Sequence, residues 1–267
     1  MTAKNKIGLE AEFFLRKDGE LVFPGDYGFS TDDLVILGEF RADPGSTRSE
    51  AIANFYKEYY NIVEKARANG LQLDISSGHT TITPEKYAEV MRKIGHKDVA
   101  GCKNIYPDVD MLKLTDAVVV DGVIKEHKLS IGLHVHFSSS DIVEKIEKRT
   151  VETFSLVKIP LSIGTVGSIA EMSLYQKTGQ SDVENKLVAS ANRITKPVLV
   201  SIVESMDADV LSIYELDETL KYRRPGFYEL KSHGGFEYRS LPFCDATLTN
   251  IYEIVDYAFT ELEKLDL

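Results

Sequence analysis

The segment from Ile7 to Leu15 alternates apolar and acidic side chains, and this alternation constrains the fold more than any other feature of the sequence. One face carries Ile7, Leu9, Ala11 and Phe13, and the other carries Glu10 and Glu12. A period of two residues predicts a β-strand with an apolar face on a core, and places both carboxylates on the opposite face, about 6 to 7 Å apart. Paired carboxylates repel unless a cation lies between them, and hard oxygen ligands suit Mg²⁺ or Mn²⁺. The alternative is a solvated strand face.

A second strand pattern carries His134 and His136, and its alternate residues Leu133, Val135 and Phe137 are predicted to face the core. Neutral imidazoles ligate metals or donate hydrogen bonds to phosphate oxygens. The alternative is a pair of histidines that neighbouring strands satisfy.

Two further segments repeat the spacing, with Glu237 and Arg239 in one and Glu39 and Arg41 in the other. In the first of these segments, the carboxylate beside the guanidinium can supply a metal ligand next to a clamp on a phosphoryl group, and a cross-strand ion pair is the alternative. For the second segment, taken alone, the alternative is an exposed edge strand. A polar-lined sheet that faces a cavity explains all four segments together.

The remaining pattern predicts strands joined by tight turns and helices with clear starts. Thr47-Arg48-Ser49-Glu50 has capping-box spacing, and apolar residues follow at helical intervals as far as Gly70. Further helices are predicted at 84–94, 141–162, 183–193 and 248–265, and the segment 199–214 is ambiguous. Strands are predicted at 7–15, 21–23, 34–41, 71–75, 129–138, 227–230 and 235–241, with a hairpin over 117–125 around Asp121-Gly122.

Because strands occur in hairpins as often as they alternate with helices, we expect an α+β fold. Its sheet should be antiparallel or mixed, with helices packed on one side, rather than doubly wound and parallel. The length of 267 residues and the absence of a linker or repeat favour a single domain over residues 1–267.

Composition excludes several classes of protein. A net charge of −11 argues against a general electrostatic grip on nucleic acid or anionic lipid. Cys102 and Cys244 lack a metal-binding spacing, and no apolar run approaches the roughly 20 residues of a membrane span. We therefore expect a soluble cytoplasmic protein, and the sequence leaves homo-oligomers open.

The order of these motifs resembles a known family. The ExE strand, a carboxylate strand, the HxHxS strand, a basic turn and the ExR strand follow one another as in the catalytic half of the glutamine synthetase-like ligases. The segments Gly8–Leu15, Gly132–His136, Tyr222–Gly226 and Phe236–Pro242 look like phage-encoded amidoligases, which are carboxylate–amine ligase-like proteins. The resemblance spans most of the chain in order.

The resemblance implies a glutamine synthetase-like fold, a curved sheet forming a cavity, and an ATP- and Mg²⁺-dependent ligase that makes amides through an acyl phosphate. The substrates would be small carboxylates and amines in the host cytoplasm. By resemblance, Glu10, His134 and Glu237 hold the metal that grips the ATP phosphates, and Glu12 and Glu39 help to hold a second metal. Arg239, with Arg223 or Arg224, would neutralise charge on the γ-phosphoryl group, and His136 would contact phosphate or substrate.

One departure from the family pattern leaves a ligand open. Only Glu39 stands between the ExE and HxH motifs, where the synthetases supply two glutamates. Asp43, Glu50, Asp74 and Asp110 are the candidates for the second carboxylate. Two other functions remain open: a metal-dependent hydrolase that uses the HxH pair to activate water, and an inactive phage binding or structural protein on the same scaffold.

Overall fold

The computed structural model describes residues 5–95, 104–105, 116–138, 201–214, 225–230 and 235–265. All of these except 201 and 202 belong to one compact unit, Met1–Ser140 with Val203–Leu267. The other unit, Asp141–Ile202, lies otherwise outside the described residues, and so do the helices predicted at 141–162 and 183–193. The single domain therefore stays a prediction.

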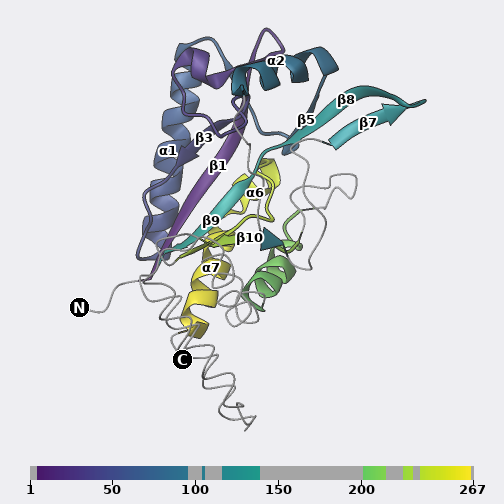
Figure 1. Ribbon diagram of the computed structural model, residues 1–267. Helices are drawn as coiled ribbons and strands as arrows, with labels where there is room; N and C mark the ends of the chain where they lie inside the picture. The colour runs from purple at the N-terminus through teal and green to yellow at the C-terminus, as the bar shows by residue number, and fades with distance from the viewer. Residues whose placement is uncertain are drawn as a thin grey trace, which may run out of the picture. The chain divides into compact units, whose positions relative to one another are not determined.

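Strand β1 (Lys6–Lys17) is the centre of the larger sheet, and every strand that pairs with it runs antiparallel to it. Its first half lies between β3 (Gly38–Arg41) and β9 (Leu133–Ser138). Its second half pairs with β2 (Glu20–Val22) and β4 (Gln72–Asp74). The sheet continues from β9, which lies beside β1 in Figure 1, through β11 (Phe236–Tyr238) and β10 (Phe227–Leu230) to β6 (Asn104–Ile105).

A second sheet of three strands contains the exposed hairpin. Its order is β5 (His79–Ile82), β8 (Val123–Ser130) and β7 (Asp116–Val120). The predicted turn at Asp121-Gly122 joins β7 to β8, with positive φ angles of 52° and 76° that suit an Asp-Gly hairpin turn.

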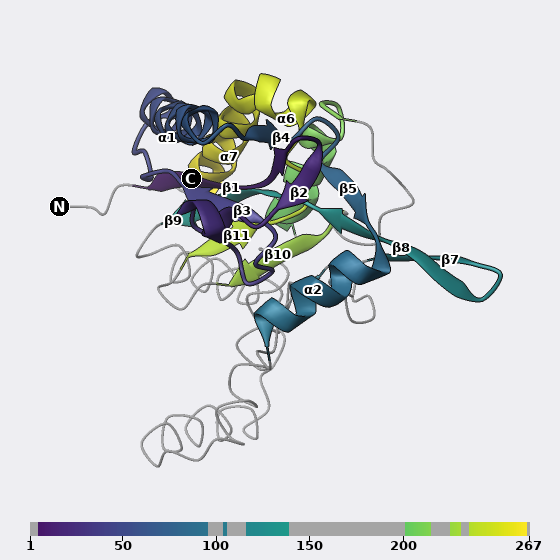
Figure 2. The ribbon, with the colours of Figure 1, turned by 90° about the horizontal axis from the view of Figure 1, so that it is seen from above.

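Helices α1 (Arg48–Ala68), α6 (Asp245–Thr249) and α7 (Ile251–Leu265) lie together on one side of the larger sheet (Figure 2). The alternation of β1 explains this arrangement, because Ile7, Leu9, Ala11 and Phe13 form part of the buried core. Phe40 of β3 continues the core, with its ring centroid 5.5 Å from Phe55 of α1 and 6.2 Å from Phe243. The burial of this face fixes which side of each strand the polar residues occupy.

Helix starts follow the sequence signals. Thr47 caps α1 by accepting a hydrogen bond from the Glu50 amide at 3.2 Å, and Glu50 in turn accepts one from the Ser46 amide at 2.7 Å. Helix α2 (Pro84–Ile94) begins with proline, as predicted, and packs on β8. A short 3₁₀ helix, η1 (Pro24–Tyr27), follows β2.

Three predicted segments have wrong boundaries. The strand at 34–41 begins only at Gly38, because Leu34 and Leu37 close a turn through a 2.8 Å backbone hydrogen bond and are buried there. The segment 129–138 is divided between β8 and β9, and 248–265 is divided between α6 and α7 at Asn250. Strand β5 falls outside the predicted strands. The ambiguous segment is helical at 201–210.

The α+β class is confirmed: helices cover a sheet whose strand pairs are all antiparallel among the described residues. Within the same residues, no helix has both the length and the apolar character that a membrane crossing requires.

Candidate metal centre

The register of the larger sheet brings polar side chains from five strands onto one face. Glu10 of β1 lies between Arg41 of β3 and His134 of β9, and Glu12 lies opposite Glu39 of β3. Residues directly opposite one another in adjacent strands share a face, so these side chains all project away from the α1 side of β1.

The same row continues to the next strands. His136 of β9 lies opposite Glu237 of β11, and Glu237 lies opposite Glu229 of β10. The row therefore joins segments that are separated in the sequence by more than 200 residues. Local pattern determines the face of each side chain, and strand pairing determines its neighbours.

The His134 imidazole lies at the centre of three carboxylates. Its Nδ1 is 3.0 Å from Glu10 Oε1 and 2.8 Å from Glu237 Oε1, and its Nε2 is 3.7 Å from Glu12 Oε1. All four side chains are at most 5% exposed. This burial strengthens each electrostatic contact, because little water screens it.

Glu10 also faces the partly open side of the cluster. Its Oε2 lies 2.6 Å from Arg41 Nε and 3.3 Å from His136 Nε2, and a second Arg41 nitrogen lies 2.9 Å from Glu39 Oε1. Neither Glu10 Oε2 nor His136 Nε2 makes a hydrogen bond of good geometry among the described residues, although both atoms are buried. These two atoms are therefore suited to a ligand placed between them.

Arg239 follows β11 and joins the two glutamates that face each other across β10 and β11. Its Nη1 lies 2.9 Å from Glu237 Oε1 and 3.1 Å from Glu229 Oε2. Like charges directly opposite in a sheet destabilise it, so a guanidinium between the two carboxylates offsets their repulsion.

Glu12 has a structural contact in addition to its place in the cluster. Its Oε2 accepts a hydrogen bond from the Gly132 amide at 2.7 Å, and its own amide donates to the Gly132 carbonyl at 2.9 Å. These bonds hold the point where the chain leaves β8 and enters β9. One carboxylate oxygen of Glu12 is thus committed to the backbone.

The pKa directions show how strongly these charges interact. Burial by itself raises the pKa of Glu10, but hydrogen bonds and charge from His134 and His136 outweigh burial and hold the pKa well below its usual value. For Glu237, burial is likewise outweighed by His134 and Arg239, and the pKa is lowered. Burial and the neighbouring charge of Glu10 raise the pKa of Glu39 to about 7, despite Arg41.

The cluster has an excess of negative charge. It contains five carboxylates, Glu10, Glu12, Glu39, Glu229 and Glu237, and two guanidinium groups, Arg41 and Arg239. With all five carboxylates ionised and both imidazoles neutral, the formal sum over these described residues is −3, and two protonated imidazoles would bring it to −1. A bound cation would remove this excess.

One set of donor atoms is close enough to share a single ion. Atoms of Glu10, His136 and Glu237 all lie within 4.8 Å of one another. Two carboxylates and one imidazole suit Mg²⁺, Mn²⁺ or Zn²⁺, so the donor chemistry fits a divalent cation without selecting one. This set contains His136, whereas the sequence hypothesis assigned His134 to the same ion.

The other predicted residues have different outcomes. Glu12, Glu39, His134 and Arg239 lie in the cluster, and Arg223, Arg224 and Asp110 lie outside the described residues. Of the alternatives for a further carboxylate, Glu50 binds the start of α1 and Asp74 pairs with Arg16 at 2.6 Å, so both are engaged elsewhere. Asp43 stays a prediction, because the 2.9 Å hydrogen bond that it accepts from the Asn54 side chain involves its backbone carbonyl and not its carboxylate.

Glu229 and Arg41 are in the cluster but are not among the site residues predicted from the sequence. Glu229 is the single acidic residue in the strand Phe227–Leu230, so no paired motif marks it. Arg41 was part of the noted Glu39-Phe40-Arg41 pattern, and its contact with Glu10 depends on the pairing of β1 with β3.

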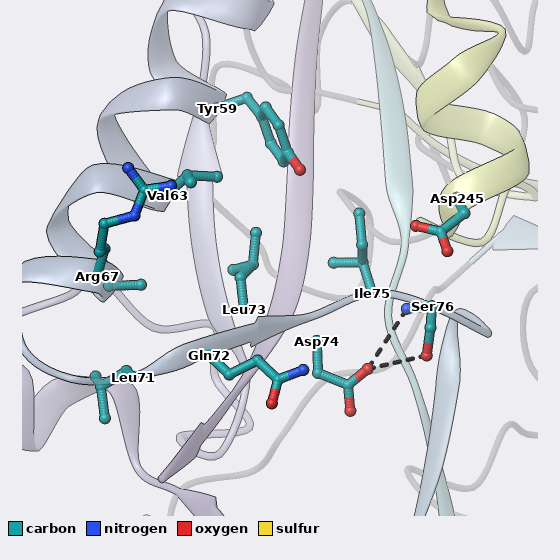
Figure 3. A pocket seen from close by; sticks show the side chains of 11 residues that line it. Tyr59, Val63, Arg67, Leu71, Gln72, Leu73, Asp74, Ile75, Ser76 and Asp245 are labelled. Atoms are coloured by element: carbon teal, nitrogen blue, oxygen red, sulfur yellow. Dashed lines mark hydrogen bonds between the residues drawn. The ribbon is translucent and has the colours of Figure 1, made fainter.

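A pocket of about 530 Å³ lies apart from this cluster, where α1, the β4 segment and the start of α6 meet (Figure 3). Leu73 and Ile75 point toward Tyr59, whereas Gln72 and Asp74 point the other way. None of the clustered charged residues lines this pocket.

Comparisons with protein-family models, curated proteins and solved structures find no match for this chain.

Proposed function

We propose that this chain is an ATP- and Mg²⁺-dependent carboxylate–amine ligase with a glutamine synthetase-like catalytic fold. The observation that carries the proposal is the convergence of Glu10, His136 and Glu237 on one point of a buried acidic sheet face, with Arg41 and Arg239 beside them. Phosphoryl transfer needs divalent cations and arginines around the phosphates, and little covalent chemistry from the protein.

In this proposal Glu10, His136 and Glu237 hold one divalent cation, and Glu12 and Glu39 face a second one. His134 keeps Glu10 and Glu237 oriented, because its Nδ1 lies within 3.0 Å of both. The cations, when bound, draw charge from the phosphate oxygens of the nucleotide. Arg239 lies at the β11 edge of the cluster, where its guanidinium would face the γ-phosphoryl group.

The reaction has two steps. A substrate carboxylate oxygen attacks the γ-phosphorus and the bond to the ADP oxygen breaks, which gives an acyl phosphate. An amine nitrogen then attacks the acyl carbon, phosphate leaves, and the amine loses a proton to solvent or a carboxylate. The buried carboxylates repel the negatively charged nucleotide phosphates and the substrate carboxylate, so these reactants can approach only when cations are bound with them.

The direct test is incubation with ATP, Mg²⁺ and pooled amino acids and amines, with ADP release and amide products as the measurements. We expect ADP release that depends on an acceptor, and at least about a hundredfold loss in Glu237→Gln, because the variant loses a charged ligand to the cation. Glu64→Gln is the control, since Glu64 is an exposed residue of α1 whose carboxylate pairs with Arg67, away from the cluster.

Two outcomes would overturn the proposal. Absence of ADP release with every acceptor, together with no nucleotide binding by calorimetry, would exclude the ligase. Tightly bound zinc after purification, with hydrolysis of an amide or ester substrate and no need for ATP, would favour the alternative metal-dependent hydrolase.

A further inference from the structure

Arg41 combines two ion pairs with high exposure at the edge of a buried cluster. Its side chain is 70% exposed, whereas those of Glu10 and Glu39 are 5% and 12% exposed. It contacts Glu10 at 2.6 Å and Glu39 at 2.9 Å, so one guanidinium joins β1 and β3 across the open side of the cluster.

The oxygen that Arg41 contacts is also the one best placed to bind a metal ion. Glu10 Oε2 lies 3.3 Å from His136 Nε2. Two neighbouring ligands of an octahedral ion with bonds of about 2.1 Å lie roughly 3.0 Å apart, so this pair needs little movement to bind one cation. A guanidinium 2.6 Å from the same oxygen opposes the approach of a second positive charge.

We propose that Arg41 is an internal cation that competes with the divalent metal ion for Glu10 and Glu39. In the metal-free protein it reduces the repulsion between these carboxylates, and it withdraws into solvent when the metal ion binds. This inference rests on the metal centre of the proposed function.

The position of Arg41 permits such a withdrawal. Because the Arg41 side chain is largely exposed, water can hydrate its guanidinium once it leaves the carboxylates, and a long exposed side chain can rotate without moving the backbone. Arg239 differs, because it is 14% exposed and lies between Glu229 and Glu237. Loss of Arg41 should therefore help metal binding, whereas an ordinary structural residue or a ligand would weaken it when lost.

The experiment is Mn²⁺ titration of the purified full chain by calorimetry, in a buffer free of phosphate and nucleotide. We expect Arg41→Gln to bind Mn²⁺ about three- to tenfold more tightly than the natural chain, the factor for removing one competing charge at a partly exposed site. Without metal, the same variant should unfold at a lower temperature, and saturating Mn²⁺ should remove most of that difference.

Arg16→Gln is the matched control, because Arg16 lies on the same strand and pairs with Asp74 away from the cluster. Its affinity for Mn²⁺ should stay within about twofold of the natural value. If Arg41→Gln does not fold without metal, Arg41→Lys replaces it. Lysine keeps the positive charge but cannot contact both carboxylates at once through a planar fork, so Mn²⁺ should bind more tightly than to the natural chain, by a smaller factor than expected for Arg41→Gln.

The outcomes separate this inference from the proposed function. A natural chain that binds no Mn²⁺ would overturn both. A natural chain that binds Mn²⁺, with equal or weaker binding by the Arg41 variant, would overturn the competition and leave the metal centre in place.

Discussion

Glu12 of β1 lies directly opposite Glu39 of β3, so two carboxylates share one face of adjacent strands. Glu12 is bound to the Gly132 amide, and Glu39 is held to the cluster through Arg41. Neither glutamate can turn away without losing its contact. The pairing therefore retains a repulsion that a cation would relieve.

The first prediction concerns Glu39→Gln in the absence of divalent metal. Because burial and the charge of Glu10 raise the pKa of Glu39 to about 7, its ionised form is disfavoured in the fold. We expect the glutamine variant to be more stable than the natural chain by about 0.5 to 1 kcal/mol at pH 8. Urea unfolding in EDTA measures this difference. Lower stability of the variant would show that the ion pair with Arg41 outweighs the repulsion.

The second prediction concerns metal-linked stability. A cation that binds only the folded state stabilises it by about 2.7 kcal/mol at a hundred times its dissociation constant. We expect Mn²⁺ to raise the unfolding temperature of the natural chain by several degrees. Glu237→Gln should lose that increment, because Glu237 belongs to the three-residue donor set. The comparison is made within each protein, with and without EDTA.

Glu64→Gln is the control for this measurement and should keep the whole increment, since Glu64 is 66% exposed and lies on α1. An equal increment in the Glu237 variant would remove Glu237 from the candidate metal centre.

Much of the fold follows from local patterns in the sequence. The alternation in β1, the capping residues of α1 and the proline of α2 each act within a few neighbouring residues, and the predicted elements formed there. The strand predicted over 34–41 was wrong in its first part, because an apolar run does not by itself distinguish a strand from a buried turn. Leu34 and Leu37 are buried in such a turn. The break after β8 depends on Gly78 and Glu12, which lie far away in the sequence.

The candidate centre was only partly predictable for a related reason. Alternation predicts that Glu10, His134 and Glu237 each face away from the apolar side of a strand, whichever strands are neighbours. The choice between His134 and His136 depends on register: His136 lies opposite Glu237, and His134 lies opposite Glu10. Glu229 carries no paired motif, so only the β10–β11 pairing reveals it.

The third prediction concerns acid stability through Arg16 and Asp74. Burial raises the pKa of Asp74, but the hydrogen bond from Arg16, 2.6 Å long, and the arginine charge outweigh burial and lower it. A lowered folded-state pKa gives stability that is present above the unfolded value near 3.8 and is lost as the pH falls through the folded value.

Asp74→Asn should therefore lose about 0.5 to 1 kcal/mol at pH 7, a range that allows for solvent screening of this partly exposed pair. Between pH 4 and pH 2 the variant should lose less further stability than the natural chain. Urea midpoints across pH 2 to 7 provide the comparison, and parallel curves for the two proteins would contradict the assignment.

The fourth prediction concerns Gly45, which pairs with Ile7 at the start of β1 through backbone hydrogen bonds of 2.9 and 3.0 Å. A Cβ atom at Gly45 would lie 2.2 Å from the Ala51 nitrogen and 2.6 Å from its Cα, and the backbone of α1 cannot rotate aside as a side chain can. Gly45→Ala should therefore destabilise the fold by about 2 kcal/mol or more, measured by urea unfolding. Gly25→Ala is the matched control, because its added Cβ would meet only Thr31 Cγ2 at an ordinary 3.6 Å. An equal effect of both substitutions would mean that lost glycine flexibility, and not the approach of α1 to the β1 edge, decides the stability at Gly45.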